Sequence, residues 1–125
     1  MACKVSYSYC EKEVTLINSY ANNVSVGSLI HSWKKVKELR LIKGNVTGIL
    51  CDFRHCEFEI EENDLKKIFH FVEKNIFLEK DIKLAIILDS PKVALVILFK
   101  RRYNFKQIKA FSTPEVAIDW MYSSY

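Results

Sequence analysis

An almost continuous run of apolar and β-branched residues extends from position 46 to position 53, after the glycine at position 44. Because polar residues hardly interrupt it, the run is typical of a strand covered on both faces, in the middle of a parallel or mixed sheet. A similar run extends from 82 to 88. An aspartate lies near the end of each run: Asp52 in the first, and Asp89 directly after the second. The pattern predicts two buried strands, at 45–52 and 82–88.

Two stretches near the N-terminus are predicted to form an antiparallel hairpin. Residues 4–10 alternate apolar or aromatic side chains with small polar ones, which is the period of a half-buried strand. Residues 14–20 are rich in strong β formers, and the pair Asn22-Asn23 is predicted to close this second strand.

Two amphipathic helices are predicted from apolar residues that recur at intervals of three and four. The first starts at Ser25, and its stripe consists of Val26, Leu29, Ile30, Trp33, Val36 and Leu39. The second is capped by Asn63, and its stripe consists of Leu65, Ile68, Phe69, Val72 and Ile76. His70 lies opposite that stripe, so we expect it in solvent. The residues between the first buried strand and this helix, 53–61, are predicted to be an acidic connector.

The C-terminal part predicts a last strand at 107–111 and a last helix. The segment Ser112-Thr113-Pro114-Glu115 has a hydroxyl cap, a proline in the first turn and a carboxylate near the positive end of the helix dipole. The buried side of this helix is expected to consist of Val116, Ala117, Trp120 and Met121.

The segment 93–99 has no polar face and allows two interpretations. With Ser90 as cap and Pro91 in the first turn it is a helix buried on several sides, by its own domain and by a partner subunit. It is also rich in β-branched residues, and 89–92 fits a hairpin turn. Periodicity cannot distinguish a buried helix from a strand in so short an apolar run. Of the two interpretations, we favour the helix.

These elements predict a single α/β domain over residues 1–125, with a mixed sheet of about five strands, helices packed on the sheet and the order β-β-α-β-α-β-α-β-α. The order resembles that of the STAS-like, or SpoIIAA-like, family of small bacterial proteins. The resemblance covers almost the whole chain, and the segments that carry it are 48–54, 63–65, 89–91 and 111–120. It implies a non-enzymatic domain with a regulatory or protein-interaction role.

One segment departs from the family pattern. The resemblance implies a phosphorylatable serine just before the helix that follows the central strand. When Leu65 is aligned with the family's leucine, the preceding residues are Glu61, Glu62, Asn63 and Asp64, and none carries a hydroxyl. A serine switch is therefore not expected here. The fixed negative charge could resemble a permanently phosphorylated state, although acidic residues before a helix also favour its dipole.

Composition narrows the functional classes. The chain has 125 residues, half of them hydrophobic, which suits one soluble domain. Its apolar runs are far shorter than a membrane span and it lacks a secretory signal pattern, so we expect a cytoplasmic protein without an integral membrane segment. Four irregularly spaced cysteines are expected to be free thiols, and the alternative is a redox or metal role for Cys51, Cys56 and His55. The net charge of +4 is mild, and its basic clusters are expected to be solvated faces rather than a nucleic-acid surface.

Ligands of open α/β sheets bind beyond the carboxyl ends of the parallel strands. That candidate ligand edge would gather Asp52, Arg54, His55, Cys56, Asp89, Ser90, Ser112 and Thr113. Most of these residues have structural duties as caps or ion-pair partners. Neither a glycine-rich phosphate loop nor a nucleophile motif is visible, so we expect neither enzymatic activity nor a cofactor.

A candidate interaction surface is predicted from apolar residues beyond those that one small sheet covers: Phe71, Phe77, Val93 and Ile97. A symmetric homodimer on this surface is expected. The alternative function is that of a carrier or sensor of a small apolar ligand, because the STAS-like fold is similar to that of the lipid-carrying Sec14 proteins. Trp33 would then border the pocket together with Phe71, Val93 and Ile97.

Overall fold

A computed structural model describes residues 2–10, 14–75, 82–88 and 108–123. These residues form a sheet of five strands in the spatial order β1-β2-β3-β4-β5. The strands are β1 (Lys4–Cys10), β2 (Thr15–Ser25), β3 (Gly48–Glu59), β4 (Lys83–Ile87) and β5 (Ile108–Phe111). β1 runs antiparallel to β2, and the other neighbours are parallel. The predicted mixed sheet is confirmed, with the first apolar run in its central strand.

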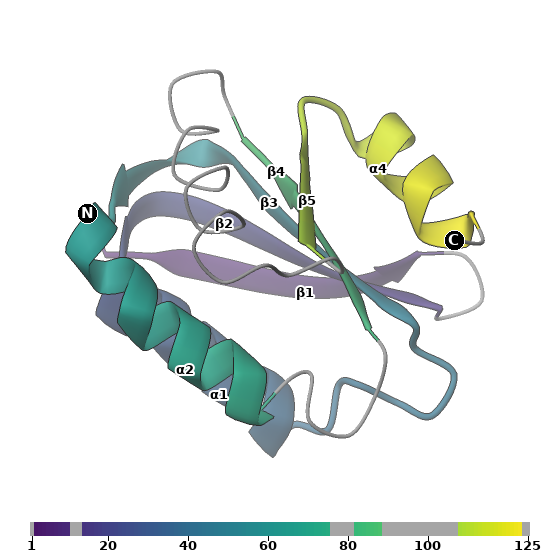
Figure 1. The fold of residues 1–125 in the computed structure, drawn as a ribbon, viewed down its shortest axis with the longest axis horizontal. Helices are drawn as coiled ribbons and strands as arrows, with labels where there is room; N and C mark the ends of the chain where they lie inside the picture. The colour runs from purple at the N-terminus through teal and green to yellow at the C-terminus, as the bar shows by residue number, and fades with distance from the viewer. Residues whose placement is uncertain (1, 11–13, 76–81, 89–107, 124–125) are drawn as a thin grey trace.

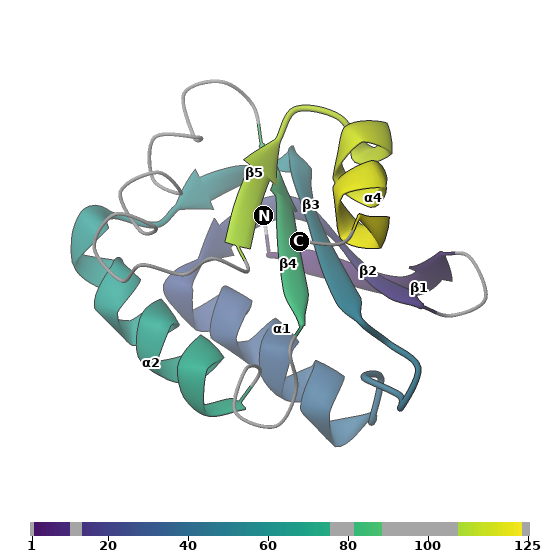
Figure 2. The same cartoon turned by 45° about the vertical axis from the view of Figure 1, so that its right-hand side comes forward.

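Helices cover both faces of this sheet (Figures 1 and 2). Helices α1 (Val26–Glu38) and α2 (Leu65–Asn75) lie side by side on one face, and α4 (Pro114–Tyr122) lies on the other. A short 3-10 helix, η1 (Glu62–Asp64), leads into α2. The helix predicted at 93–99 lies outside the described residues.

Helix α1 begins with a capping box. The backbone N–H of Ser28 donates to the Ser25 hydroxyl oxygen at 3.1 Å, and the backbone N–H of Ser25 donates to the Ser28 hydroxyl oxygen at 2.8 Å. Leu29, Trp33 and Val36 are buried as the stripe predicted. Leu39 is not part of that stripe, because the helix ends before it and its side chain is 58 % exposed.

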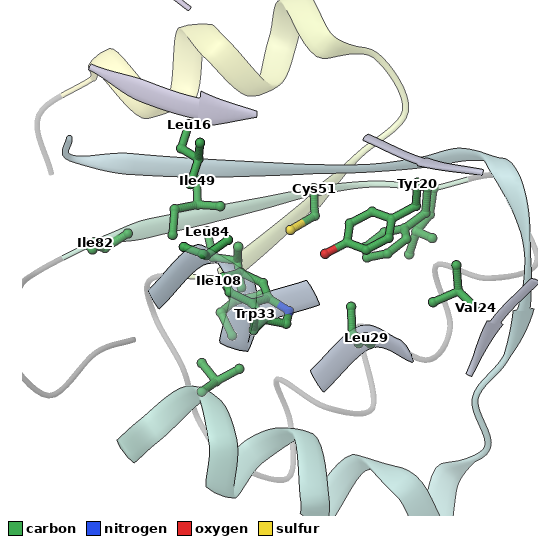
Figure 3. Packing of buried hydrophobic residues seen from close by; sticks show 14 of the residues in the cluster. Leu16, Tyr20, Val24, Leu29, Trp33, Ile49, Cys51, Ile82, Leu84 and Ile108 are labelled. Carbon is green, nitrogen blue, oxygen red and sulfur yellow. The ribbon is translucent and has the colours of Figure 1, made fainter. Parts of the chain in front are cut away.

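The main core lies between the sheet and the helices α1 and α2 (Figure 3). Every second residue of the central strands faces it, in agreement with the two-residue period of a strand. Its members include Leu16, Tyr20, Ile49, Cys51, Phe53, Leu84 and Ile108 from the sheet and Leu29, Trp33, Val36 and Val72 from the helices. The rings of Tyr20 and Phe53 stack, with centroids 4.5 Å apart.

Strand β3 is longer than predicted. It continues to Glu59, so the segment 53–59 is not a connector. Ser19 pairs with Asp52 and Ala21 pairs with His55, so two steps along β2 match three along β3. The extra residue is a β-bulge, which interrupts the alternation of side chains where the strand resumes.

Strand β2 also runs past its predicted end, through Asn22 and Asn23 to Ser25. Asn22 has a positive φ of 67°, a conformation that asparagine adopts more readily than most residues. Val24 is fully buried in the main core. The asparagine pair thus lies inside β2, paired with Cys56 and Glu57 beyond the bulge, and does not end the strand.

The second face is covered by α4 through a smaller core of Leu50, Ala85, Ile87, Ala117 and Met121. Gly48 allows this packing, because a Cβ there would lie 2.8 Å from the Met121 sulfur. Val116, expected on the buried side, is 55 % exposed. Thr113 is the N-cap residue and Pro114 follows it, but the Thr113 hydroxyl makes no capping hydrogen bond.

The entry into α2 differs from its prediction. Asn63 is not the residue that precedes the helix, because it lies within η1. Asp64 comes directly before α2, and one of its carboxylate oxygens accepts a hydrogen bond from the backbone N–H of Glu61 at 3.0 Å. Val72 is buried and His70 is exposed, as the stripe predicted.

Candidate functional site

Asp52 and Arg54 form an ion pair with two parallel hydrogen bonds at the bulge of β3. Arg54 donates from Nε to Asp52 Oδ1 at 3.0 Å and from a terminal nitrogen to Asp52 Oδ2 at 2.8 Å. The backbone N–H of Arg54 donates to Oδ1 at 3.1 Å. Such bidentate pairs are among the strongest side-chain hydrogen-bond arrangements. The pair lies inside the strand, so its first role is to hold the geometry of the bulge.

The environment of Asp52 favours its ionised form. Burial alone would raise the pKa of this carboxyl, whose side chain is 11 % exposed. The hydrogen bonds from Arg54, its positive charge and that of His55 more than offset the effect, so that the pKa lies below its ordinary value. A carboxylate held in this way is a poor general acid or base near neutral pH.

The other predicted residues of the ligand edge are placed differently. His55 does not lie in a loop: it is an exposed residue of β3, paired in the ladder with Ala21. Cys56 faces the opposite side of the sheet, where it is buried and its thiol donates to the Phe53 carbonyl oxygen at 3.2 Å. The structure therefore brings Asp52, Arg54 and His55 together and separates Cys56 from them.

Ser112 and Thr113 are exposed where β5 leads into α4, and Phe111 before them pairs with Ile87. Asp52 also pairs with Ile87, from the other side of β4, so both segments belong to the carboxyl edge of the sheet. Asp89 and Ser90 lie outside the described residues. Only part of the predicted edge can thus be placed.

A second feature of this edge is a strongly acidic segment between the bulge and α2. Residues 57–64 contain five carboxylates and no basic residue: Glu57, Glu59, Glu61, Glu62 and Asp64. Glu57, Glu59 and Glu61 are exposed, while Phe58 and Ile60 between them pack against the main core. The end of β3 and the residue Glu61 after it therefore present carboxylates to solvent, and we call residues 57–64 the acidic segment.

Sequence reasoning placed these carboxylates in a connector and did not include them in the candidate site. The signal was present, because residues 56–61 alternate strictly between apolar and acidic, the pattern of a strand with one buried face. The charge density of the segment obscured that alternation.

The charged groups that the described part of this edge brings together are Asp52, Arg54 and His55, with the acidic segment beyond them. Among the described residues, no group of three or more His, Cys, Asp or Glu side chains is arranged to hold a metal ion. No helix in the part of the chain that the structure describes is long and apolar enough to cross a membrane. The four cysteines all lie in the described residues and form no disulfide, as predicted. What the arrangement offers is charge and hydrogen-bonding groups at a sheet edge.

The predicted apolar surface is only partly visible. Phe71 is half-buried and packs against the main core, and its carbonyl oxygen accepts a hydrogen bond from Asn75 Nδ2 at 3.0 Å. Phe77, Val93 and Ile97 lie outside the described residues. Contact of these residues with a partner stays a prediction.

No protein-family model matches the chain, and no curated protein matches it significantly. Solved structures do match over nearly its full length. An anti-sigma factor antagonist from Mycobacterium paratuberculosis has a TM-score of 0.67 at 11% identity, covering 98% of this chain and 96% of that one.

Two further structures have the same architecture. An uncharacterised protein of the DUF3478 family from Shewanella loihica PV-4, with a SpoIIAA-like fold, has a TM-score of 0.59 at 13% identity, covering 95% of this chain and 93% of that one. The anti-sigma factor antagonist SpoIIAA, in its unphosphorylated form, has a TM-score of 0.58 at 14% identity, covering 94% and 96%. Likeness at such low identity concerns the fold, and the chain has the SpoIIAA-like fold.

Proposed function

We propose that this chain is a non-enzymatic regulatory module that binds a partner protein through the acidic segment at 57–64. The observation that carries the proposal is the exposure of Glu57, Glu59 and Glu61, directly before η1. Exposed carboxylates in one segment create a strong local negative potential, which steers and selects partners more than it stabilises the fold.

The partner that fits this segment has a basic surface. No lysine, arginine or histidine lies within residues 57–64 to neutralise the carboxylates. The hydrogen bond from the Glu61 backbone to Asp64 fixes the turn and leaves the Glu61 side chain exposed. A partner that presents lysine or arginine side chains would form charge-assisted hydrogen bonds with a preorganised set of acceptors.

Similar structures support a regulatory role. Two of them are anti-sigma factor antagonists, and the fold has been solved in a phosphorylated form of SpoIIAA. In this chain Glu61, Glu62, Asn63 and Asp64 occupy the place of the serine segment that the STAS-like resemblance implies. A constant negative charge would then replace a switchable one, so partner binding would not depend on a kinase at this position.

Protein binding is better supported than carriage of an apolar ligand. Two of the residues expected to border a ligand pocket are described: Trp33 is 4 % exposed and lies within the main core, and the half-buried Phe71 packs against that core. A ligand there would have to displace core contacts. Native mass spectrometry of protein purified from its own host would detect such a ligand as a mass increment.

The test compares charge reversals at two exposed sites. The variant Glu59→Lys/Glu61→Lys changes the acidic segment, and Glu115→Lys/Asp119→Lys makes the same change in net charge on α4. In pull-downs from native lysate, we expect a partner that the wild type and the α4 variant retain and the first variant loses. Equal capture by both variants, or no specific capture by the wild type, would contradict the proposal.

A further inference from the structure

Strand β1 is an edge of the sheet. It pairs with β2 over all seven residues from Lys4 to Cys10 without a register shift, and no other strand among the described residues pairs with it (Figures 1 and 2). One side of its backbone therefore has N–H and C=O groups that no strand in the described part of the chain pairs with. Such an edge is a template on which another strand can add.

This edge lacks the features that usually prevent strand addition. Residues 4–10 contain neither proline nor glycine, and Lys4, at one end, is the only charged residue. The strand is about 23 Å long, as seven residues in extended conformation require. The side chains of Ser6 and Ser8, on the face away from α1, are exposed and small. A second strand could thus approach along the full length.

The edge is also held rigidly from within its own subunit. The Tyr7 hydroxyl donates to the carbonyl oxygen of Ser32 at 2.8 Å, and the Tyr9 hydroxyl donates to that of Leu41 at 2.7 Å. Val5 packs against the main core together with both tyrosines. Because the strand is already ordered, pairing would cost little further conformational entropy.

The order of side chains in β1 identifies the occupant of this edge. Around Tyr7 the sequence is nearly the same in both directions: serine at 6 and 8, and a larger apolar or aromatic residue at 5 and 9. An antiparallel pair of identical strands centred on Tyr7 would place Ser6 opposite Ser8 and Val5 opposite Tyr9. Lys4 would lie opposite the uncharged Cys10, so no like charges would meet.

We propose that two copies of this chain associate through antiparallel pairing of their β1 strands about a two-fold axis at Tyr7, forming one continuous sheet. A two-fold interface requires a self-complementary surface, and a near-palindromic strand provides one. Pairs of an aromatic with a β-branched residue, such as Tyr9 with Val5, are favourable across antiparallel strands. This dimer uses other residues than the acidic segment, so it stands or falls independently of the proposed function.

The test uses two double variants of the exposed serines. Ser6→Lys/Ser8→Lys would place ammonium groups opposite each other twice per dimer, whereas Ser6→Lys/Ser8→Glu would place opposite charges there. We expect sedimentation equilibrium of the full chain to show a dimer for the wild type, a dissociation constant raised about tenfold or more in the first variant, and no such loss in the second. Circular dichroism spectra and melting temperatures would verify that both variants are folded.

Hydrogen exchange provides a second readout. Amide protons of β1 that face the free edge should exchange more slowly as the wild-type concentration increases, and those of α4 should not change. A monomer at all concentrations would overturn the proposal. A dimer equally strong in both variants would place the interface elsewhere, and equal weakening of both would overturn the register centred on Tyr7.

Discussion

The side-chain ammonium of Lys83 donates a hydrogen bond to the carbonyl oxygen of Trp120, 2.9 Å away in the last turn of α4. It also donates to the carbonyl oxygen of Ser123 at 2.6 Å, and it lies 5.2 Å from the centroid of the Trp120 ring. Lys83 is only 8 % exposed, on a strand below the helix. A buried cation thus occupies the negative end of the helix dipole and fastens α4 to the sheet.

Replacing Lys83 with methionine should loosen α4. The substitution preserves most of the side-chain volume but removes the hydrogen bonds from a charged donor, each of which contributes on the order of 1–3 kcal/mol. Relative to the wild type, we expect Lys83→Met to have a lower free energy of unfolding in urea. Its hydrogen exchange should be accelerated more in α4 than in α1. Lys109→Met, at an exposed position of neighbouring β5, is the matched control and should change little. Equal effects of the two substitutions would contradict the anchoring role.

Replacing Asp52 with asparagine should lower stability in a pH-dependent way. The pKa of Asp52 is lower in the folded protein than its ordinary value, so its carboxylate stabilises the fold above the unfolded-state pKa of about 3.9. That contribution is lost as the pH falls through the folded-state pKa. We expect Asp52→Asn to cost about 1–2 kcal/mol at pH 7, because a hydrogen-bonded charge is lost, and much less near pH 2.

Urea denaturation of the wild type and Asp52→Asn at both pH values measures this difference. Asp119→Asn on the exposed side of α4 serves as a control for the loss of one carboxylate. If Asp52→Asn were equally destabilising at pH 7 and near pH 2, the ion pair with Arg54 would not be the source of the effect.

The sequence predicts the bounds of an element correctly where one period of apolar and polar residues continues through the whole element. Lys4–Cys10 was predicted with its exact bounds, because its alternation is not interrupted. The predicted strand at 45–52 ends too early, because the bulge after Asp52 shifts the alternation of β3. The charges of Arg54 and His55 at that place are also typical of a loop. A bulge depends on pairing with β2, which no local pattern contains.

The candidate site was predictable only in part for a related reason. The pairing of Asp52 with Arg54 follows from their separation by one residue in a strand, where alternate side chains share a face. Assigning Cys56 to the same edge was wrong, because the bulge turns it to the core face. Tertiary pairing therefore decides which of the residues 52–56 share a surface.

The four thiols should differ sharply in reactivity. Cys51 is 1 % exposed, and burial raises the pKa of its thiol well above the ordinary value. Cys56 is also buried, whereas Cys3 and Cys10 are half-buried. Because the thiolate is the reacting species, iodoacetamide should modify Cys3 and Cys10 first in the folded protein. Peptide mass spectrometry would follow the four sites, and the differences should disappear in urea. Alkylation of Cys51 as fast as Cys10 would contradict this burial.

Asn18 places a side-chain amide in the core between the sheet and the helices. It is fully buried on β2, and among the described residues neither its side-chain nitrogen nor its side-chain oxygen has a hydrogen-bond partner. Burial raises the pKa of the Tyr20 hydroxyl, and the nearby Asn18 amide opposes part of that increase. No hydrogen bond of ordinary geometry joins the two side chains, however.

An unpaired buried amide destabilises a fold because water satisfies it only in the unfolded chain. Leucine has nearly the same shape and no polar atom, so Asn18→Leu should raise the free energy of unfolding by about 1–3 kcal/mol. Asn23→Leu, at a half-buried position of the same strand, is the control and should give no comparable gain. Urea denaturation of the three proteins measures both effects. A loss of stability in Asn18→Leu would mean that the amide is hydrogen-bonded in the folded protein, and it would refute the prediction.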